Sequence, residues 1–143
     1  MLVLDTDHVS LLLRPESREG AALEDRLAAL GGGKVATTIV TFEEQFRGWL
    51  AVIAKARRPD QLVTAYGRLQ AFLGAFRQIP VLPFDADAAR EFERLRRLRL
   101  RIGMMDLRIA AMALSRGATL LTRNKRDFEI IPDLQIEDWT VTP

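Results

Sequence analysis

Short apolar runs alternate with longer segments of helical periodicity along this chain. The apolar runs have the length and β-branched content of buried strands, and they cover residues 2–4, 35–40, 79–84, 118–122 and 134–136. The segments between them carry apolar residues three or four positions apart, which predicts helices at residues 8–13, 21–30, 41–56, 59–76, 85–100 and 106–116. Strands that alternate with helices predict a three-layer α/β/α protein with a mostly parallel sheet of four or five strands.

Proline and glycine mark the boundaries of several predicted elements. Residues 15–20 are predicted to form a loop, and Gly31–Gly33 are expected to end the helix that precedes them. Pro80 and Pro83 cannot donate a sheet hydrogen bond, so the strand that contains them is expected at an edge of the sheet. Trp139 follows the last strand and is expected to pack over its end.

Length and composition predict one folded domain over residues 1–143. The apolar content of 48% and the charged content of 28% are ordinary for a globular protein. No apolar stretch approaches the roughly 20 residues of a membrane span, and no signal peptide is visible. Together with the absence of cysteine, these features predict a cytoplasmic protein that does not contact a membrane.

The same composition restricts the chemistry of any metal site. The chain has no cysteine and a single histidine, His8, which excludes thiolate ligands, a cysteine nucleophile and a site built from several histidines. A bound metal would therefore be held mainly by oxygen, which favours Mg²⁺ or Mn²⁺ over Zn²⁺.

Acidic residues follow or face the carboxyl ends of the predicted strands. Asp5 comes directly after the first strand, and Glu43–Glu44, Asp106 and Asp127 occupy similar places later in the chain. In open α/β sheets, ligands bind outside the carboxyl ends of the strands. Carboxylates gathered there need a proton, a hydrogen-bond donor or a metal, so the pattern indicates a divalent cation.

Helix capping is the alternative interpretation for the acids near the first strand and the second predicted strand. Asp5 could cap the first helix, although Thr6 or Asp7 could do the same. Thr41 and Glu44 match a capping box. A helical wheel alone does not decide between Glu43 and Glu44 as the residue that faces a site.

Capping is also the alternative for the two later acids. Asp106 begins the apolar face of its own helix and should point inward, but it could equally cap that helix. Asn124 could cap a short turn that has Asp127 in its first turn, and either residue could instead be a ligand.

Basic residues are concentrated in one predicted helix and the loop after it. The net charge is only +2, yet arginine occupies positions 90, 94, 96, 97, 99 and 101. A basic surface beside an acidic metal site would suit a polyanionic substrate. The alternative is a solvated helix face, stabilised by pairs such as Glu93 with Arg97.

The acidic segments resemble the motifs of a known family. Leu4-Asp5-Thr6-Asp7 and Thr41-Phe42-Glu43-Glu44 with Gly48 resemble the first two motifs of PIN-domain ribonucleases, and Ile102–Ala111 resembles the third. Thr122–Phe128 and Leu134–Trp139 resemble the remaining motifs. The order and spacing of these motifs are most similar to VapC-type toxins of bacterial toxin–antitoxin pairs.

The resemblance implies a PIN-like fold and an endoribonuclease that uses Mg²⁺ or Mn²⁺ to hydrolyse RNA. It assigns metal ligation and catalysis to Asp5, Glu44, Asp106 and Asp127, with Asn124 as the alternative fourth ligand. It also implies supporting roles for Thr6, Asp7, Thr122 and Asn124. With RNA as the substrate, Arg96, Arg97 and Arg99 are the residues expected to contact it. A cognate antitoxin that blocks the site and a homodimer are further implications.

Two positions depart from the family pattern. Asp7 stands where the family often has asparagine, which adds negative charge beside the site. Asn124 stands where some members have the fourth acid, while others use the position of Asp127.

Two rival functions remain at this point. The segment Leu2–Val9 also resembles the first motif of haloacid-dehalogenase-type phosphatases, in which Asp5 would be the nucleophile and Asp7 the general acid. The later acidic motif of that family is not found in the chain. A non-catalytic interaction module with the same fold is the second rival, and the intact set of acids argues against it.

Overall fold

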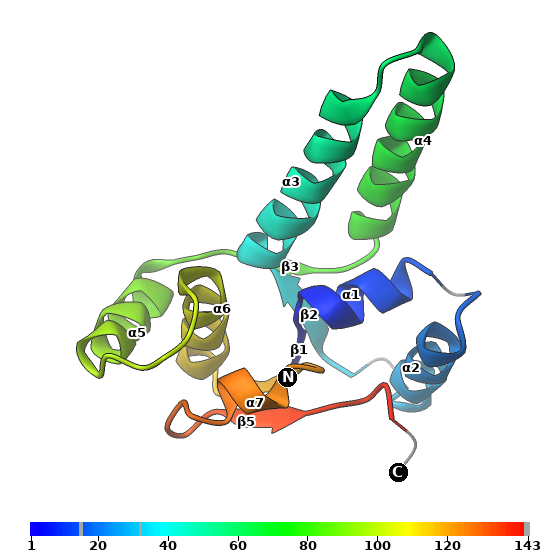
Figure 1. Ribbon diagram of the computed structural model, residues 1–143. Coiled ribbons are helices and arrows are strands. Elements are labelled where there is room, and N and C mark those ends of the chain that lie inside the picture. Colours follow the sequence, from blue (N-terminus) through cyan, green and yellow to red (C-terminus); the bar gives the residue numbers. More distant parts are fainter. Residues whose placement is uncertain (15, 32, 142–143) are drawn as a thin grey trace.

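A parallel five-stranded sheet forms the centre of the computed structural model, which describes residues 1–14, 16–31 and 33–141 (Figure 1). The strand order is β3-β2-β1-β4-β5, and every neighbouring pair is parallel. The strands are β1 (Leu2–Leu4), β2 (Val35–Thr38), β3 (Val81–Leu82), β4 (Thr119–Leu121) and β5 (Gln135–Glu137). The predicted three-layer α/β fold is confirmed, and β3 lies at an edge as its prolines predicted.

The register of the sheet aligns the ends of its three central strands. Leu4 of β1 lies opposite Thr37 of β2 and Leu121 of β4. The residues that follow β1 and β4, Asp5 and Thr122, therefore emerge at the same edge.

Helices cover both faces of this sheet. They are α1 (Thr6–Leu12), α2 (Arg18–Ala29), α3 (Ile39–Lys55), α4 (Pro59–Phe76), α5 (Ala86–Arg97), α6 (Met104–Ser115) and α7 (Lys125–Phe128). Val3 packs into the cluster that contains α5 and α6, whereas Leu4 packs into the cluster that contains α1, α2 and the end of α4. Successive strand residues point to opposite faces, so β1 supplies both cores.

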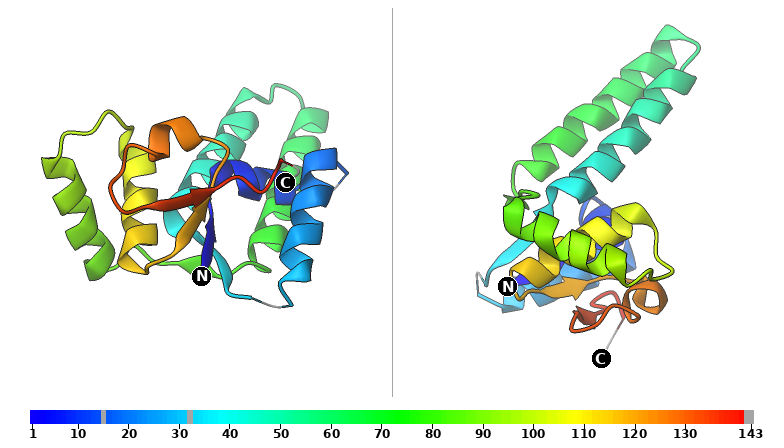
Figure 2. Two further views of the ribbon diagram at one scale, coloured as in Figure 1. Left: turned by 90° about the horizontal axis from the view of Figure 1, so that it is seen from below. Right: turned by 90° about the vertical axis from the view of Figure 1, so that its left-hand side faces the viewer.

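The long helices α3 and α4 form a hairpin that projects away from the sheet (Figures 1 and 2). Aromatic rings hold its base together, with Phe42 and Phe72 stacked at a centroid separation of 5.5 Å. Phe76 meets Phe42 and Phe72 edge-on, at 5.3 and 4.8 Å. This seam fixes the start of α3, which carries Glu44, against the rest of the fold.

Capping explains two differences from the predicted boundaries. The strand predicted to reach Val40 ends at Thr38, because the Thr38 hydroxyl accepts the backbone N–H of Thr41 at 2.9 Å and starts α3. Helix α2 begins inside the predicted loop 15–20, because Ser17 accepts the N–H of Gly20 at 3.0 Å.

Further differences concern the start of α1 and the end of α5. Helix α1 begins at Thr6, two residues before the predicted start, because Asp5 caps it. Helix α5 ends at Arg97, not at residue 100, and Arg99 beyond it has a φ of 52°. The predicted glycine stop is seen at Gly31, with a φ of 63°, while Pro15 and Gly32 lie outside the described residues.

Trp139 follows β5 and is buried, as predicted. The Arg26 guanidinium lies 4.4 Å from the centroid of its ring. A search of the described ranges finds no helix with the length and apolar character that crossing a membrane requires.

Candidate metal centre

Acidic side chains from four separate segments lie within electrostatic range of one another beyond the carboxyl ends of the central strands. They are Asp5, Asp7, Glu44, Asp106 and Asp127, here called the acid cluster. Among the described residues, the ligand atoms of Asp5, Asp7 and His8 lie within 4.8 Å of one another, and Glu44, Asp106 and Asp127 do not form such a group with Asp5. Burial raises the pKa of Glu44, and the charge of Asp106 raises it further. Burial likewise raises the pKa of Asp106, followed by the charges of Asp127 and Asp7. The acids therefore act on one another through space, although up to 122 positions separate them in the sequence.

Asp5 combines a capping bond with deep burial. Its side chain is 5% exposed and accepts the N–H of Asp7 at 3.0 Å, so it is the N-cap of α1. Burial and then the adjacent Asp7 raise the pKa of Asp5 to about 9, while a hydrogen bond with Thr122 acts in the opposite direction. In the absence of a cation, Asp5 therefore carries a proton at neutral pH.

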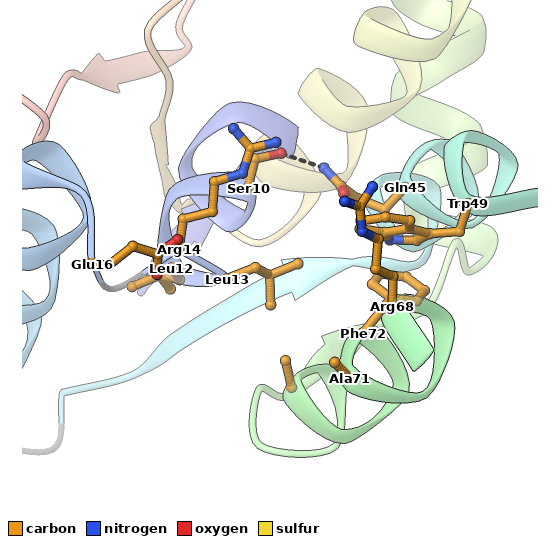
Figure 3. A pocket seen from close by; sticks show the side chains of 11 residues that line it. Ser10, Leu12, Leu13, Arg14, Glu16, Gln45, Trp49, Arg68, Ala71 and Phe72 are labelled. Carbon is orange, nitrogen blue, oxygen red and sulfur yellow. Dashed lines mark hydrogen bonds between the residues drawn. The ribbon is translucent and has the colours of Figure 1, made fainter. Parts of the chain in front are cut away.

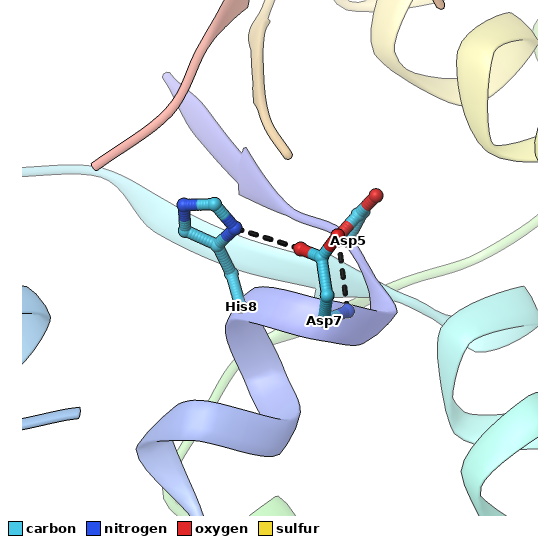
Figure 4. A group of neighbouring side chains, drawn as sticks. All are labelled: Asp5, Asp7 and His8. Carbon is cyan, nitrogen blue, oxygen red and sulfur yellow. Dashed lines mark hydrogen bonds and ion pairs between the residues drawn. The ribbon is translucent and has the colours of Figure 1, made fainter. Parts of the chain in front are cut away.

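Asp7 is the anionic member of this pair. It accepts the backbone N–H of Arg123 with both oxygens, at 3.2 and 3.0 Å, and pairs with His8 Nδ1 at 2.8 Å (Figure 4). Burial raises the pKa of Asp7, but hydrogen bonds with His8 and Asp5 outweigh burial and bring the pKa below its ordinary value. Asp7 thus stays ionised beside a protonated Asp5.

His8 supports Asp7 and is not itself available as a ligand. The side chain is fully buried, and its Nε2 accepts the backbone N–H of Trp139 at 3.2 Å. Nδ1 therefore carries the ring hydrogen and donates it to Asp7. His8 lies within 4.8 Å of oxygens of Asp5 and Asp7, but both of its nitrogens are already engaged.

Glu44, and not Glu43, faces the acid cluster. The Thr6 hydroxyl donates to Glu44 Oε1 at 3.2 Å, whereas Glu43 pairs with Arg47 at 2.6 Å along the surface of α3. The capping-box interpretation of Glu44 is wrong, because Thr38 is the N-cap of α3. A role of Glu44 as a metal ligand stays a prediction.

Asp106 lies in the first turn of α6 without capping it. The N-cap is Gly103, and no side chain hydrogen-bonds to this helix start. The capping alternative for Asp106 is therefore wrong. The side chain is half-buried at the acid cluster, and its role as a ligand stays a prediction.

The fourth position involves Asn124 and Asp127 together. The Asn124 amide donates to Asp127 Oδ2 at 2.9 Å, and the Asn124 backbone N–H donates to the buried Thr122 hydroxyl at 2.9 Å. Asn124 precedes α7 but makes no side-chain capping bond. Asp127 is exposed, so a cation can reach its carboxylate. The hydrogen bond from Asn124 orients that carboxylate.

The donor chemistry of the acid cluster fits a divalent cation. Within residues 1–14, 16–31 and 33–141, no lysine or arginine forms an ion pair with Asp5, Glu44, Asp106 or Asp127. Every available donor is an oxygen, the ligand type that Mg²⁺ and Mn²⁺ prefer. A cation would relieve the like-charge repulsion that raises the pKa values of Glu44 and Asp106.

The predicted RNA-contacting arginines lie at the end of α5. Arg96 and Arg97 both approach Glu93, at 3.6 and 3.8 Å, and all three side chains are exposed. The connection from α5 to α6, which includes Arg99, lies on the same side of the molecule as α7 (Figure 2, left). It leads directly into the first turn of α6, where Asp106 lies.

A groove leads away from the acid cluster along α3. A hollow of about 310 Å³ has Glu44, Gln45, Gly48, Trp49 and Val52 on its walls. A larger hollow of about 690 Å³ between α1, α3 and α4 shares Gln45 and Trp49 with it and extends to Arg14 and Arg68 (Figure 3). Gln45, which lines both hollows, links α3 to α1. Its amide nitrogen donates to Ser10 Oγ at 2.6 Å and to the Thr6 carbonyl at 3.2 Å.

Comparison with known proteins gives one family and several relatives. The model of the PIN domain matches residues 2–134. The tRNA(fMet)-specific endonuclease VapC of Shigella flexneri is 32% identical over 78% of this chain and 80% of its own length. Ribonuclease VapC5 of Mycobacterium tuberculosis is 36% identical over 85% of this chain and 82% of its own length.

A solved structure has the same fold. The crystal structure of DNA-bound VapBC from Salmonella typhimurium matches with a TM-score of 0.72 and 25% identity. The match covers 96% of this chain and 97% of the other.

Proposed function

Because the chain belongs to the PIN-domain family, we propose that it is a divalent-metal-dependent endoribonuclease and the toxin of a toxin–antitoxin pair. The observation that carries this proposal is the acid cluster, in which Asp5, Glu44, Asp106 and Asp127 form no ion pair with lysine or arginine in the described ranges. The ribonuclease names of the two relatives that share about a third of their residues with it support the same activity. The protein is a hydrolase on this basis.

Asp5, Glu44, Asp106 and Asp127 would hold Mg²⁺ or Mn²⁺. The bound cation would activate a water molecule and offset the charge of the scissile phosphate. The chain itself orients the ligands, since Thr6 donates to Glu44 and Asn124 donates to Asp127. Asp5 must lose its proton before it can serve as a ligand, because its pKa is raised to about 9.

The order of the acidic motifs argues against the phosphatase alternative. A phosphatase of that type needs a later acidic motif that the chain lacks, whereas the PIN-domain match covers residues 2–134 and so includes Asp5, Glu44, Asp106 and Asp127. An interaction module without activity would have no use for the like charges that raise the pKa values of Glu44 and Asp106, because this repulsion costs stability in the metal-free protein.

RNA is the proposed substrate, and the end of α5 is its proposed contact. Arg96, Arg97 and Arg99 are exposed and precede α6 by only a few residues. Their positive charge, on the segment that leads into the helix of Asp106, suits a phosphodiester chain that must reach the cation.

An antitoxin is the proposed protein partner, and the groove along α3 is its proposed site. VapBC-5 of Mycobacterium tuberculosis, which matches with a TM-score of 0.56 and 27% identity, is a member of the VapBC family of toxin–antitoxin systems. The groove is continuous with Glu44 and contains Trp49, whose indole Nε1 is buried without a hydrogen-bond partner in the described part of the chain. A peptide that crosses this groove would also cover the acid cluster. The homodimer and the cytoplasmic location stay predictions.

The decisive experiment is an RNA cleavage assay with the purified protein. We expect cleavage in Mg²⁺ or Mn²⁺, loss of cleavage in excess EDTA, and no cleavage by Asp5→Asn. Full cleavage in EDTA would contradict the proposed function, and a phosphate analogue trapped on Asp5 would support the phosphatase instead.

A further inference from the structure

The buried histidine links the acid cluster to the last segment of the chain. His8 receives the N–H of Trp139 on Nε2 at 3.2 Å, and its Nδ1 lies 2.8 Å from Asp7 Oδ1. Asp7 in turn receives the N–H of Arg123 on both oxygens. Three segments that are distant in the sequence are thus joined through one imidazole ring.

We propose that His8 is a positioning residue for the acid cluster. Its Nδ1–H holds the Asp7 carboxylate against the Arg123 amide, and this fixes the β4–α7 loop with Asn124, and the start of α7 with Asp127, beside Asp5. The proposal rests on the proposed function, because it assigns His8 a task for the metal ligands.

The hydrogen-bond directions support this task. A backbone N–H can only donate, so Trp139 fixes Nε2 as an acceptor and directs the ring hydrogen toward Asp7. A histidine whose second nitrogen is held in this way presents a donor of fixed position, as metal-site neighbours commonly do.

The Trp139 amide is itself held firmly. The indole packs under Arg26 at 4.4 Å, and its Nε1 donates to Glu137 at 2.7 Å. Next to it, the Thr140 N–H and hydroxyl donate to Asp138 Oδ1 at 2.9 and 2.6 Å. The segment after β5 therefore serves as a fixed support for His8, and through it for Asp7.

The loop that Asp7 anchors carries the fourth candidate ligand. Arg123 directly precedes Asn124, whose backbone N–H and side chain bond to Thr122 and Asp127. Without the donor from His8, Asp7 could rotate away from the Arg123 amide or share a proton with Asp5. Either change would loosen the geometry of the ligands while leaving all of them present.

Two substitutions of His8 separate its hydrogen bond to Asp7 from its hydrogen bond with Trp139. In His8→Asn, the amide nitrogen takes a place near Nδ1 and keeps a donor for Asp7, while the acceptor for Trp139 is lost. In His8→Gln, the amide oxygen takes a place near Nε2 and keeps the acceptor for Trp139, while the donor for Asp7 is lost. Val9→Ala is the matched control, because Val9 is equally buried on the same helix and only its backbone N–H, which the substitution keeps, bonds to Asp5.

The measurements are the Kd for Mn²⁺ by calorimetry, kcat and KM for RNA cleavage, and the hydrogen-exchange rate of the Arg123 amide in EDTA. We expect His8→Gln to weaken Mn²⁺ binding by about tenfold or more and to lower kcat with little change in KM. We expect His8→Asn, which keeps the donor for Asp7, to lose less Mn²⁺ affinity than His8→Gln, and the Arg123 amide to exchange faster in His8→Gln than in His8→Asn.

The outcomes are distinguishable from a failure of the proposed function. Wild-type Mn²⁺ affinity in His8→Gln, or equal losses in His8→Gln and Val9→Ala, would overturn the positioning role. If the wild-type protein bound no divalent cation, the proposed function would fail, and an unchanged Arg123 exchange rate in His8→Gln would separately overturn the link through Asp7.

Discussion

The Thr6 hydroxyl donates a hydrogen bond of 3.2 Å to Glu44 Oε1 and so joins the start of α1 to α3. The two residues are 38 positions apart, and the contact forms because β1 and β2 are neighbours in the sheet and end at the same edge. Gln45 reinforces it by donating to the Thr6 carbonyl. Glu44 is consequently held toward the acid cluster, while its neighbour Glu43 points along the helix surface to Arg47.

Replacement of Glu44 should therefore harm activity far more than replacement of Glu43. We expect Glu44→Gln to lower kcat for RNA cleavage by at least about a hundredfold, since loss of a ligand should exceed the 10–100-fold effect of a supporting residue. Glu43→Gln loses only an exposed ion pair, worth about 0.5 kcal/mol or less, and should keep nearly full activity. Equal losses in the two variants, measured under the same Mg²⁺ concentration, would contradict the proposed ligand set.

Asp106→Ala tests whether the half-buried acid is a ligand. Since Asp106 makes no capping bond, its removal should not cost the roughly 1 kcal/mol that loss of a cap costs. Burial and the charges of Asp127 and Asp7 raise the pKa of Asp106, so removal of its charge should leave the metal-free protein equally or more stable. Wild type should gain stability in excess Mn²⁺ by mass action, and the variant much less.

Melting curves for both proteins, in EDTA and in excess Mn²⁺, make this comparison. Asp106→Asn is the matched control, because it removes the charge and keeps the size of the side chain. A variant that lost stability in EDTA and kept the full metal-induced increase would show that Asp106 has a structural task only.

Much of this architecture follows from patterns within short segments. Alternation of apolar runs and amphipathic helices was sufficient for the layers of the fold, because each element buries its own apolar face. The errors at Thr38 and Ser17 arise from capping, in which one side chain decides where a helix begins. Ile39 and Val40 favour strands by composition, and the Thr38 cap overrides that preference.

The candidate site was harder to predict, because its internal contacts are not local. The short motifs indicated Asp5, Glu44 and Asp106, and the helical wheel alone favoured neither Glu43 nor Glu44. Only the contact with Thr6 separates those two glutamates. The role of His8 depends on Trp139, which lies 131 positions away, and no spacing within one segment could reveal such a pair.

Neutralising the arginines at the end of α5 should weaken RNA binding without changing the chemistry. We expect Arg96→Gln, Arg97→Gln and Arg99→Gln in combination to raise KM and leave kcat nearly unchanged. The slope of log K against log salt should become shallower by about 2, given roughly 0.7 for each contact with a single strand. Measurements at several salt concentrations give this slope directly.

A matched triple variant controls for the loss of net charge. Lys55, Arg57 and Arg58 lie at the distal end of the projecting α3–α4 hairpin (Figure 1), and their replacement by glutamine removes the same charge far from the acid cluster. We expect this control to bind RNA with the wild-type salt slope. If the salt slope changed equally in the two triple variants, Arg96, Arg97 and Arg99 would only form a solvated helix face and would not contact RNA.

The groove along α3 should be required for binding of the antitoxin. Trp49→Ala removes the indole that lines both hollows and should weaken capture of the antitoxin co-expressed from the native operon by tenfold or more, in the range of a central aromatic contact. Val63→Ala is a suitable control, since Val63 is 75% exposed on α4 and lines neither hollow. Equal antitoxin capture by Trp49→Ala and Val63→Ala would place the partner elsewhere.

The proton on Asp5 should make metal binding strongly dependent on pH. Burial and the neighbouring Asp7 raise the pKa of Asp5 to about 9 in the metal-free protein, so a cation must displace that proton below this pH. We expect Mn²⁺ affinity to rise about tenfold for each pH unit between pH 6 and 8, with close to one proton released per ion.

The stability of the metal-free protein should change in the opposite sense. Above pH 3.8 the unfolded chain has lost a proton that the folded chain keeps, so the contribution of Asp5 to stability falls as pH rises toward 9. Calorimetry in buffers of different ionisation enthalpy counts the released proton, and Asp5→Asn should remove the stability slope. A wild-type Mn²⁺ affinity that stays constant from pH 6 to 8 would mean that Asp5 is already ionised before the cation binds.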